Sequence, residues 1–561
     1  MGLLLVVLVS SAVFSASGEL FSAIAHMENL VAAEQDLAQS LDRYLDAEQA
    51  RLERVKAIAR FVTNISKEAN VNVDRYLGHP VNAYRLLRRF MSDWSTVENL
   101  VVRPATSEDF ASLLSYYKPT FPNQDDLSGA ATALMRLQNT YRIVPSEMVD
   151  GKIPGDQKEK LSSTDCYYLG TVAYEDEKYK HARDWMDETL KRLEIEDASD
   201  LNVVNIYDYL AYSEYKLGNV KRATRLTRKM ISLEPGHLRA QANLAHYQRM
   251  LADERLKSGE EPTGDDVMAT EEEEERQPTF DEEKDEDYRL DLDPRSWPWE
   301  VERRRYEKLC REPLPIDRWR AKHFKCFYST GGRNPQLVLR PIAVEVAYIK
   351  PTVLVYRGVL SDVEMDRLKE LASPMLMRAT IIPKENAGPP APGKFRISKS
   401  AWLGQEHDNT GIVERINTRI EALTGLDMST AEQLQVVNYG IGGHYEPHYD
   451  YARKGEDAFS DLDIGNRIAT FLFYLSDVEA GGATVFPGAG ARIIPSKGDA
   501  TFWYNLMPSG TGDLLTRHAG CPVLSGFKWV CNKWIHERGQ EFRRGCKINE
   551  NMDWDIHVPE T

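Results

Sequence analysis

Residues 438–454 read NYGIGGHYEPHYDYARK, and a metal-binding pattern in this stretch indicates the fold of the C-terminal third of the chain. The pattern is His448-x-Asp450, whose two-residue step puts both side chains on one face of an extended segment. A third candidate ligand, His518 in TRHAGCP, follows 68 residues after Asp450, far enough to return on a neighbouring strand. Two imidazoles and one carboxylate bind Fe(II) and leave three adjacent coordination positions open. The spacing therefore predicts an iron site that accepts a 2-oxo acid and O₂.

A lysine near the third ligand strengthens this interpretation. A lone HxD triplet is weak support, because the chain has 12 histidines and surface HxD triplets outnumber metal-binding ones. Lys528 lies ten residues beyond His518, past a turn at Gly526, so we expect it on the next strand. There its ammonium group would pair with the distal carboxylate of 2-oxoglutarate.

The residues around these side chains have the character of β-strands. Aromatic and β-branched runs, separated by Gly and Pro turns, occupy 468–478, 498–507 and 528–537. Such a set predicts a jelly-roll sandwich over residues 351–550. The chain has 561 residues, enough for several domains, and the regions before this block are helical in pattern. The predicted class is therefore α+β and multidomain.

Residues 160–255 contain a repeat of the tetratricopeptide kind. One unit carries the pattern of small and apolar residues at Leu210, Ala211, Gly218, Ala223 and Pro235. The Leu-Ala pair recurs at Leu244, 34 residues after Leu210, and an earlier unit follows the same order over 169–186. Small residues let paired helices approach closely, so stacked pairs form a groove.

Three tyrosines crowd one helix of this repeat. Tyr209, Tyr212 and Tyr215 are spaced three apart and therefore lie roughly along one face. Aromatic faces suit an extended proline-rich peptide, whose polyproline II conformation is ordered before binding. The alternative is that these tyrosines only pack the repeat.

The N-terminus carries a run typical of a secretory signal. Residues 3–16 are apolar, too short to span a bilayer, and small residues at 15–18 offer a cleavage site. We expect a signal peptide over 1–18, although the positive n-region is missing and an apolar helix of the mature fold is the alternative. No later run approaches a membrane-spanning length, which predicts a soluble mature chain in an oxidising compartment. A sequon at Asn64 fits a glycoprotein.

Residues 19–155 are predicted to form a helical assembly domain. Apolar residues recur at three- and four-residue steps from Leu20 to Val62, which indicates one long amphipathic helix or two. The apolar face of such a helix needs a second surface to bury it. Self-association through this segment and packing on the chain's own helices at 80–145 both provide one.

An acidic segment separates the two halves of the chain. Residues 256–295 include the unbroken run Glu271 to Glu275 and few apolar residues, so we expect a solvated linker. A connector over 296–350 holds two of six cysteines and leads into the last block. The net charge of −16 argues against nucleic acid as a partner.

Four segments together resemble the alpha subunit of collagen prolyl 4-hydroxylase. They are NYGIGGHYEPHYDYARK, GNRIATFLFYLSDVEAGGATVFP, TRHAGCPVLSGFKWVCNKWIHERGQEFRR and the repeat over 160–255. The resemblance implies a double-stranded β-helix that hydroxylates proline in X-Pro-Gly repeats of procollagen. It also implies oxidative decarboxylation of 2-oxoglutarate to succinate and CO₂, with Fe(II), O₂ and L-ascorbate as the other requirements.

The resemblance assigns roles to individual residues. It implies that His448, Asp450 and His518 are the iron ligands, that Lys528 holds 2-oxoglutarate and that Tyr439 lines the cofactor pocket. The substrate-binding residues it implies are Arg396 and Trp534 near the reacting proline, and Tyr209, Tyr212, Arg239 and Asn243 in the peptide groove. The next groove position, often tyrosine in the family, is His246 here, so the resemblance does not fix the peptide preference of this chain.

The resemblance also implies disulfides and partners. The implied pairs are Cys310 with Cys326 and Cys521 with Cys546, which leaves Cys166 and Cys531 free. The family works as an α2β2 tetramer with protein disulfide isomerase as the beta subunit. Since the terminal residues HVPET carry no KDEL-type signal, the resemblance implies retention in the endoplasmic reticulum lumen through that partner.

Overall fold

The structure is a computed structural model that describes most of the chain. Described are residues 49–101, 124–155, 157, 160–196, 200–258, 280, 297–316, 318–332, 334–378, 396–440, 442–456, 459 and 463–548. The predicted signal peptide, the first part of the amphipathic run and most of the acidic linker lie outside the described residues. The chain divides into two compact units, Met1–Val71 with Ser92–Phe121 and Asn72–Met91 with Pro122–Thr561.

The smaller unit is helical in its described part. Residues 49–71 form a helix, and α4 (Trp94–Val101) follows the π-helix η1 (Arg89–Asp93). The guanidinium of Arg51 donates a hydrogen bond to the carbonyl oxygen of Leu100 at 2.6 Å, which ties the two helices together. The helical prediction for the end of the amphipathic run is confirmed.

The larger unit begins with short helices that pack on a long one. These are α2 (Val73–Leu77), α3 (Pro80–Arg88), α6 (Gln124–Tyr141) and α7 (Pro145–Val149). Pro80 stands at the start of α3, where a missing N–H costs nothing, and His79 caps the helix. Tyr84 of α3, Leu134 of α6 and Trp185 share one buried core.

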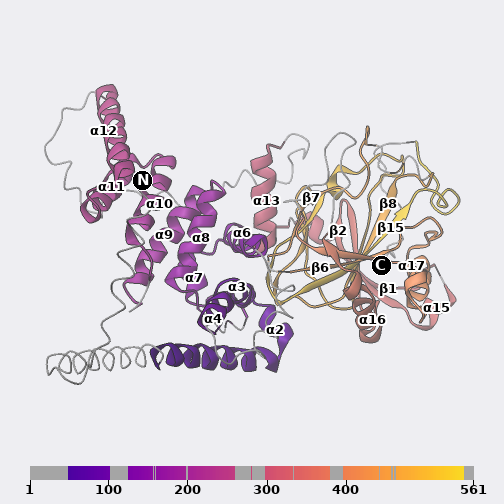
Figure 1. Cartoon of the computed structure of the whole chain (residues 1–561). Helices are drawn as coiled ribbons and strands as arrows, with labels where there is room; N and C mark the ends of the chain where they lie inside the picture. Colours follow the sequence, from indigo (N-terminus) through magenta and orange to yellow (C-terminus); the bar gives the residue numbers. More distant parts are fainter. Residues whose placement is uncertain are drawn as a thin grey trace, which may run out of the picture. The chain divides into compact units, whose positions relative to one another are not determined.

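Five antiparallel helices form the repeat (Figure 1). They are α8 (Ser163–Glu175), α9 (Tyr179–Leu193), α10 (Val203–Lys216), α11 (Val220–Leu233) and α12 (Leu238–Ser258). A Cβ atom at Gly170 would lie 2.8 Å from the terminal methyl carbon of Met186, so a larger residue there would push the Met186 side chain aside where α8 meets α9. This is the role that the sequence predicts for small residues in the repeat.

The C-terminal block is a sandwich of antiparallel strands, as expected for a jelly roll. A nine-stranded sheet has the order β1-β2-β3-β12-β8-β15-β6-β5-β4, and a four-stranded sheet has the order β11-β10-β13-β7. The strands are β1 (Cys326–Ser329), β2 (Ile342–Ile349), β3 (Thr352–Tyr356), β4 (Met377–Arg378), β5 (Lys399–Leu403), β6 (Leu434–Tyr439), β7 (Tyr445–His448), β8 (Arg467–Tyr474), β9 (Ala480–Gly481), β10 (Thr484–Phe486), β11 (Ala491–Ile493), β12 (Ala500–Tyr504), β13 (His518–Gly520), β14 (Val523–Ser525) and β15 (Lys528–His536).

Alternation along β15 explains how this sandwich holds both a core and a site. Cys531 and Ile535 belong to the core between the large sheet and helices α16 (Asp362–Ala372) and α17 (Ile412–Thr424). Lys528 and Trp534 line a pocket on the other face. Successive side chains of a strand point to opposite faces, so alternate residues of β15 from Lys528 to Trp534 face the site.

The boundary predicted at residue 351 is placed differently by the structure. β2 and β3 pair antiparallel, with Ile349 opposite Thr352, and β1 pairs with β2. The catalytic sheet therefore begins at Cys326, and part of the expected connector belongs to it. The remaining short helices of this region are α14 (Arg318–Ala321), α15 (Pro335–Leu339), η5 (Ser373–Met375), η6 (Gln405–His407) and η8 (Leu514–Thr516).

The expected disulfide pairs are wrong in this structure. Cys310 is bonded to Cys521, with the Cα atoms 5.5 Å apart, while Cys326 and Cys546 are exposed and unbonded. The reason is the packing of α13 (Trp299–Arg311), whose Cys310 shares a buried cluster with Val485 of β10 and Ala519 of β13. Cys166 and Cys531 are buried thiols, as expected.

Among the described helices, none is both long enough and apolar enough to cross a membrane.

Candidate active site

Two neighbouring strands bring the three predicted metal ligands together. His448 ends β7, His518 begins β13, and the two residues are directly paired in the antiparallel ladder. Asp450 lies between them: its Oδ1 is 3.5 Å from Nε2 of His448, and its Oδ2 is 3.6 Å from Nε2 of His518. One ligand atom from each residue lies within 4.8 Å of the others. The sequence predicts that the chain comes back to the site 68 residues after Asp450. In the structure it does so because β13, which begins at His518, pairs with β7.

Backbone carbonyls orient both imidazoles. Nδ1 of His448 lies 2.8 Å from the carbonyl oxygen of Glu446, and Nδ1 of His518 lies 3.0 Å from that of Thr516. An imidazole that donates from Nδ1 to a carbonyl keeps Nε2 free of a proton. Both rings therefore present Nε2 to Asp450 as metal-binding atoms.

The charges of the three groups suit a metal ion. Burial lowers the pKa of His518 to about 4, so its imidazole is neutral at physiological pH. Burial alone would raise the pKa of Asp450, but the neighbouring His518 and His448 hold it far below its ordinary value. A neutral imidazole and an ionised carboxylate are the forms in which these side chains bind metals.

A chain of buried hydrogen bonds holds Asp450 in place. The hydroxyl of Thr470 donates to Oδ2 of Asp450 at 2.7 Å, and the amide of Asn505 donates to that hydroxyl at 2.9 Å. The indole N–H of Trp503 donates to Asn505 at 2.8 Å. Sequence reasoning did not find these residues, because Thr470 and Trp503 lie in buried strands, and Asn505 directly follows one, where the pattern gives no sign of a polar network.

The donor set fits Fe(II). Two imidazole nitrogens and one carboxylate oxygen on adjacent strands form the facial triad of non-haem Fe(II) oxygenases, which leaves positions open for other ligands. All three side chains are mostly buried, with relative exposure of 18% for His448, 5% for Asp450 and 8% for His518. A partly enclosed site of this kind limits the access of water.

A cradle for an acidic ligand lies beside the triad. Lys528 is paired with Tyr439 across β15 and β6, and its Nζ lies 5.3 Å from the centre of the Tyr439 ring. A Cβ atom built on Gly520 would lie 3.8 Å from both Lys528 Nζ and the Tyr439 hydroxyl, so the glycine keeps this space open. Burial lowers the pKa of Lys528 to about 7. A buried ammonium group in such a space needs an anion.

Aromatic and cationic side chains line the approach to the metal ligands. The ring of Tyr445 stacks on His448 at 3.5 Å between centroids, and the Arg396 guanidinium lies 4.7 Å from the Tyr445 ring. Trp534 lines the same pocket as the triad, and the guanidinium of Arg467 lies 3.8 Å above its ring. Arg396, Trp534 and Tyr445 therefore lie close to the three candidate metal ligands.

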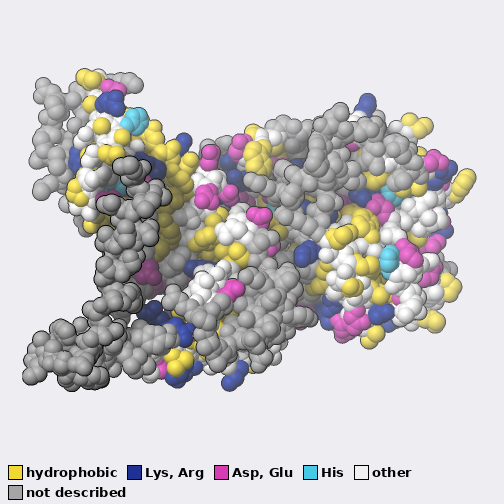
Figure 2. Space-filling model, in the orientation of Figure 1, with side chains coloured by type: hydrophobic (Ala, Val, Ile, Leu, Met, Phe, Trp, Pro, Cys, Tyr) yellow, Lys and Arg dark blue, Asp and Glu magenta, His cyan; other side chains and the backbone are white. Residues whose placement is uncertain are grey.

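The predicted peptide-binding tyrosines form part of a larger aromatic cluster. The ring of Tyr174 lies 4.9 Å from Tyr209 and 5.6 Å from Tyr212, and Tyr212 lies 5.9 Å from Tyr215. Tyr179 extends the cluster at 6.2 Å from Tyr212. Tyr209, Tyr212 and Tyr215 are half-buried, so each offers part of its ring to solvent. Figure 2 shows hydrophobic side chains gathered over this part of the repeat.

Two α12 side chains approach these rings, Arg239 at Tyr174 and His246 at Tyr215. Arg239 forms an ion pair with Asp208 at 3.1 Å, and Asn243 is half-buried one turn further along α12. His246 is exposed, and its Nε2 lies 3.2 Å from the Tyr215 hydroxyl. His246, the position that departs from the family's pattern, therefore lies against Tyr215 of the aromatic cluster.

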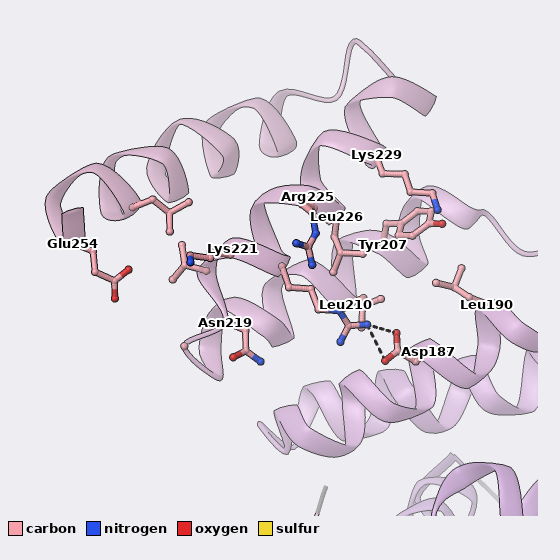
Figure 3. Close-up of a pocket in the computed structure, with 14 residues that line it drawn as sticks. Asp187, Leu190, Tyr207, Leu210, Asn219, Lys221, Arg225, Leu226, Lys229 and Glu254 are labelled. Carbon is pink, nitrogen blue, oxygen red and sulfur yellow. Dashed lines mark hydrogen bonds and ion pairs between the residues drawn. The ribbon is translucent and has the colours of Figure 1, made fainter. Parts of the chain in front are cut away.

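Apart from the aromatic cluster, the repeat has a pocket that is lined by other residues (Figure 3). Asp187, Leu190, Leu226 and Lys229 help to line it, and Arg222 donates to both carboxylate oxygens of Asp187 at 2.8 and 3.1 Å. None of the predicted peptide-binding residues lines this pocket. Arg222 also pairs with Glu214, so its charge is satisfied within the protein.

Three protein families match consecutive parts of the chain. Residues 23–155 match the family described as prolyl 4-hydroxylase alpha-subunit, N-terminal region, and residues 163–253 match the prolyl 4-hydroxylase peptide-substrate-binding domain. Residues 434–536 match the 2OG-Fe(II) oxygenase superfamily, and this range includes the metal triad and Lys528.

Relatives that match nearly the whole chain include alpha-1 and alpha-2 subunits of prolyl 4-hydroxylase. The chain is 44% identical over 537 residues to prolyl 4-hydroxylase subunit alpha-1 of Gallus gallus, covering 95% of this chain and 99% of the relative. It is 44% identical over 536 residues to the subunit alpha-1 of Homo sapiens, covering 94% and 96%. A solved structure of a viral collagen prolyl hydroxylase from Paramecium Bursaria Chlorella virus-1 is 27% identical over 33% of this chain and 95% of that one, with a TM-score of 0.27.

Proposed function

This chain belongs to the family of prolyl 4-hydroxylase alpha subunits, and from that premise we propose which of its residues perform the hydroxylation of proline that depends on iron and 2-oxoglutarate. His448, Asp450 and His518 hold Fe(II) through two Nε2 atoms and one carboxylate oxygen. The observation that carries this assignment is the direct pairing of His448 with His518 across β7 and β13, with Asp450 between their Nε2 atoms.

Lys528 anchors the cosubstrate in this proposal. Its ammonium group neutralises the distal carboxylate of 2-oxoglutarate in the cradle that Gly520 leaves open, and the Tyr439 hydroxyl lies on the same side of that space. The other end of 2-oxoglutarate then reaches the open side of the triad. Because the pKa of Lys528 is about 7 without a bound anion, an incoming carboxylate favours the charged form.

The iron site, when loaded, supplies the activation of O₂ that couples decarboxylation of 2-oxoglutarate to hydroxylation at C4 of a peptidyl proline. The residues of this chain position the reactants for that step. Tyr445 packs on His448 and under Arg396, and Trp534 lies in the same pocket. We propose that these three side chains form the wall against which the substrate proline ring packs, excluding water from the reacting carbon.

The aromatic cluster of the repeat holds the rest of the peptide. A proline-rich strand in the polyproline II conformation presents flat ring faces that pack on tyrosines. In our proposal, Tyr209 and Tyr212 provide these faces, while Arg239 and Asn243 donate hydrogen bonds to peptide carbonyls. Successive X-Pro-Gly triplets of one strand are thereby kept close to the catalytic block.

Assembly and location complete the proposal. The relatives are named as subunits, which supports an assembly with a second kind of chain. We propose an α2β2 tetramer in which protein disulfide isomerase is the beta subunit, located in the endoplasmic reticulum lumen after removal of a signal peptide over 1–18. The apolar run at residues 3–16 supports the route into that compartment.

Co-expression tests the proposal. The chain is produced with protein disulfide isomerase, and a (Pro-Pro-Gly) peptide is incubated with the product, Fe(II), ascorbate and 2-oxoglutarate. We expect the peptide to gain the mass of oxygen atoms only when 2-oxoglutarate is present. The control is the same incubation with protein disulfide isomerase produced without the chain, which should leave the mass of the peptide unchanged. A peptide of unchanged mass with the wild-type protein contradicts the proposal.

A further inference from the structure

One helix outside the strand sandwich contacts two loops that lead into the active site. This helix is α6, which precedes β1 in the sequence. It bonds to the repeat, because the side chain of Gln138 accepts a hydrogen bond from the indole N–H of Trp185 at 2.9 Å. It also bonds to Gly442, shortly before β7, and to Pro522, directly before β14. The same helix therefore contacts both the repeat and the catalytic block.

The first contact lies at the turn before β7. The guanidinium of Arg136 donates a hydrogen bond to the carbonyl oxygen of Gly442 at 3.1 Å. A Cβ atom at Gly442 would lie 3.0 Å from the carbonyl oxygen of Ala133, and the φ angle of Gly442 is +54°. Glycine tolerates this angle and lets the turn lie directly against α6. His448, the first metal ligand, follows Gly442 by six residues and ends β7.

The second contact lies between the strand that begins at His518 and the strand that begins at Lys528. The hydroxyl of Tyr141 donates a hydrogen bond to the carbonyl oxygen of Pro522 at 2.5 Å. Leu524, two residues further on, is buried in the core that α6 shares with α3 and the repeat. Tyr141 therefore holds the connection between the third metal ligand and the lysine of the 2-oxoglutarate cradle.

The two loops are also bonded to each other. The backbone N–H of Val523 donates a hydrogen bond to the carbonyl oxygen of Gly443 at 3.1 Å. Each of these residues directly follows a residue that α6 contacts. Arg136 and Tyr141 therefore hold a joined pair of loops.

We propose that Arg136 and Tyr141 of α6 are positioning residues of the active site, which hold the loops before β7 and β14 so that the metal ligands and Lys528 stay in place. The inference rests on the site proposed above. Neither side chain lines the pocket that the triad shares with Lys528, so both act through the backbone. The strands concerned, β7, β13 and β14, are three or four residues long. Since strands this short form few ladder bonds, a contact from outside the sheet contributes much of their order.

Hydrogen exchange of the assembled full-length protein, without iron or 2-oxoglutarate, tests the hold on the loops. Tyr141→Phe removes only a hydroxyl, and we expect exchange over 442–448 and 521–528 to become about 3- to 10-fold faster, the usual effect of losing one hydrogen bond. Arg136→Met should have the same effect, and Arg136→Lys, which keeps a donor, should restore part of the protection. Exchange over 203–216 in α10 should not change.

Ligand binding separates a positioning role from a merely structural one. For Tyr141→Phe and Arg136→Met, we expect Fe(II) affinity to fall and the KM for 2-oxoglutarate to rise, by about 3- to 10-fold each, with a smaller change in kcat. The loss should be at the low end of that for partners bonded directly to a metal ligand, because these two residues act through the backbone.

Two substitutions are matched controls. Tyr168→Phe removes a hydroxyl that accepts a hydrogen bond from Gln124, on a ring that packs against the same core as Tyr141. Arg249→Met removes a guanidinium that donates to a carbonyl oxygen of its own helix, α12. Both variants should match wild type in exchange and in ligand binding.

Two outcomes would overturn the proposal. One is unchanged exchange at both loops in Tyr141→Phe and Arg136→Met, and the other is faster exchange with unchanged Fe(II) affinity and KM for 2-oxoglutarate. Exchange and iron titration need no peptide substrate. Their failure is therefore distinguishable from failure of the hydroxylation proposed above.

Discussion

The hydroxyl of Thr470 donates a hydrogen bond to Oδ2 of Asp450 at 2.7 Å, and this contact fixes the only carboxylate among the three metal ligands. Thr470 lies on β8 of the large sheet, while Asp450 follows β7 of the small one. The bond therefore joins the two sheets at the metal site, and Asn505 and Trp503 extend it into the core.

Removing this hydroxyl should loosen the metal. Thr470→Val keeps the shape of the side chain but leaves Asp450 free to turn away from the two imidazoles. We expect Fe(II) affinity to fall by about 10- to 100-fold, the usual effect of losing a partner of a metal ligand. Thr470→Ser, which keeps the donor, should bind iron almost as wild type. Titration of Fe(II), followed by the fluorescence of nearby Trp503, measures both. Equal iron affinity in Thr470→Val and wild type would show that this contact has no role in binding.

Lys528 should control the affinity for 2-oxoglutarate and leave iron binding unchanged. Lys528→Ala leaves the cosubstrate carboxylate buried without its cation, at a cost of roughly 3–5 kcal/mol. Lys528→Arg keeps the charge on a wider, forked group and should be partly active with a raised KM. The KM for 2-oxoglutarate, measured with saturating iron, separates these cases. Equal KM values for 2-oxoglutarate in wild type and both variants would contradict this role of Lys528.

The affinity for 2-oxoglutarate should fall as the pH rises. Burial places the pKa of Lys528 at about 7 before the ligand binds, below its ordinary value of 10.5. Below that pH the site is already charged, and above it binding must draw a proton to the lysine, so the dissociation constant should rise by about tenfold per pH unit. The increase ends at the higher pKa of the complex. Lys528→Arg stays charged throughout and should lose this dependence, which provides the control.

Peptide affinity should depend on the aromatic cluster. Tyr209→Ala removes a ring that packs against Tyr174 and should weaken binding of a proline-rich peptide by about 1–3 kcal/mol in the full-length chain. Tyr328→Ala, at an exposed position of β1, is the matched control. Calorimetry that finds the same affinity in both variants would leave the tyrosines as packing residues. Replacing His246 by tyrosine then tests whether this position sets peptide preference.

The metal ligands could be predicted from the sequence because their information is local. The two-residue step from His448 to Asp450 fixes a shared face, and the pattern of strands and turns indicates that His518 returns on the strand beside His448. Lys528 lies on β15 of the other sheet, paired with β6, and this placement across the two sheets is not local information. Thr470 could not be found in this way, because its contact with Asp450 depends on how the two sheets pack together. Thr470 lies on β8 of the large sheet, whereas Asp450 follows β7 of the small one. The same limit applies to the disulfide, whose cysteines are 211 residues apart and meet only because α13 packs on β10.

Incubation with isotopically labelled O₂ tests the assignment of the active site most directly. If His448, Asp450 and His518 support coupled hydroxylation, one heavy oxygen atom should appear in 4-hydroxyproline of a (Pro-Pro-Gly) peptide and the other in succinate. His518→Ala, which removes one of the three ligands, should give neither product. Label in both products at the wild-type rate with His518→Ala, or hydroxyproline formed without labelled succinate in the wild type, would contradict the proposed site.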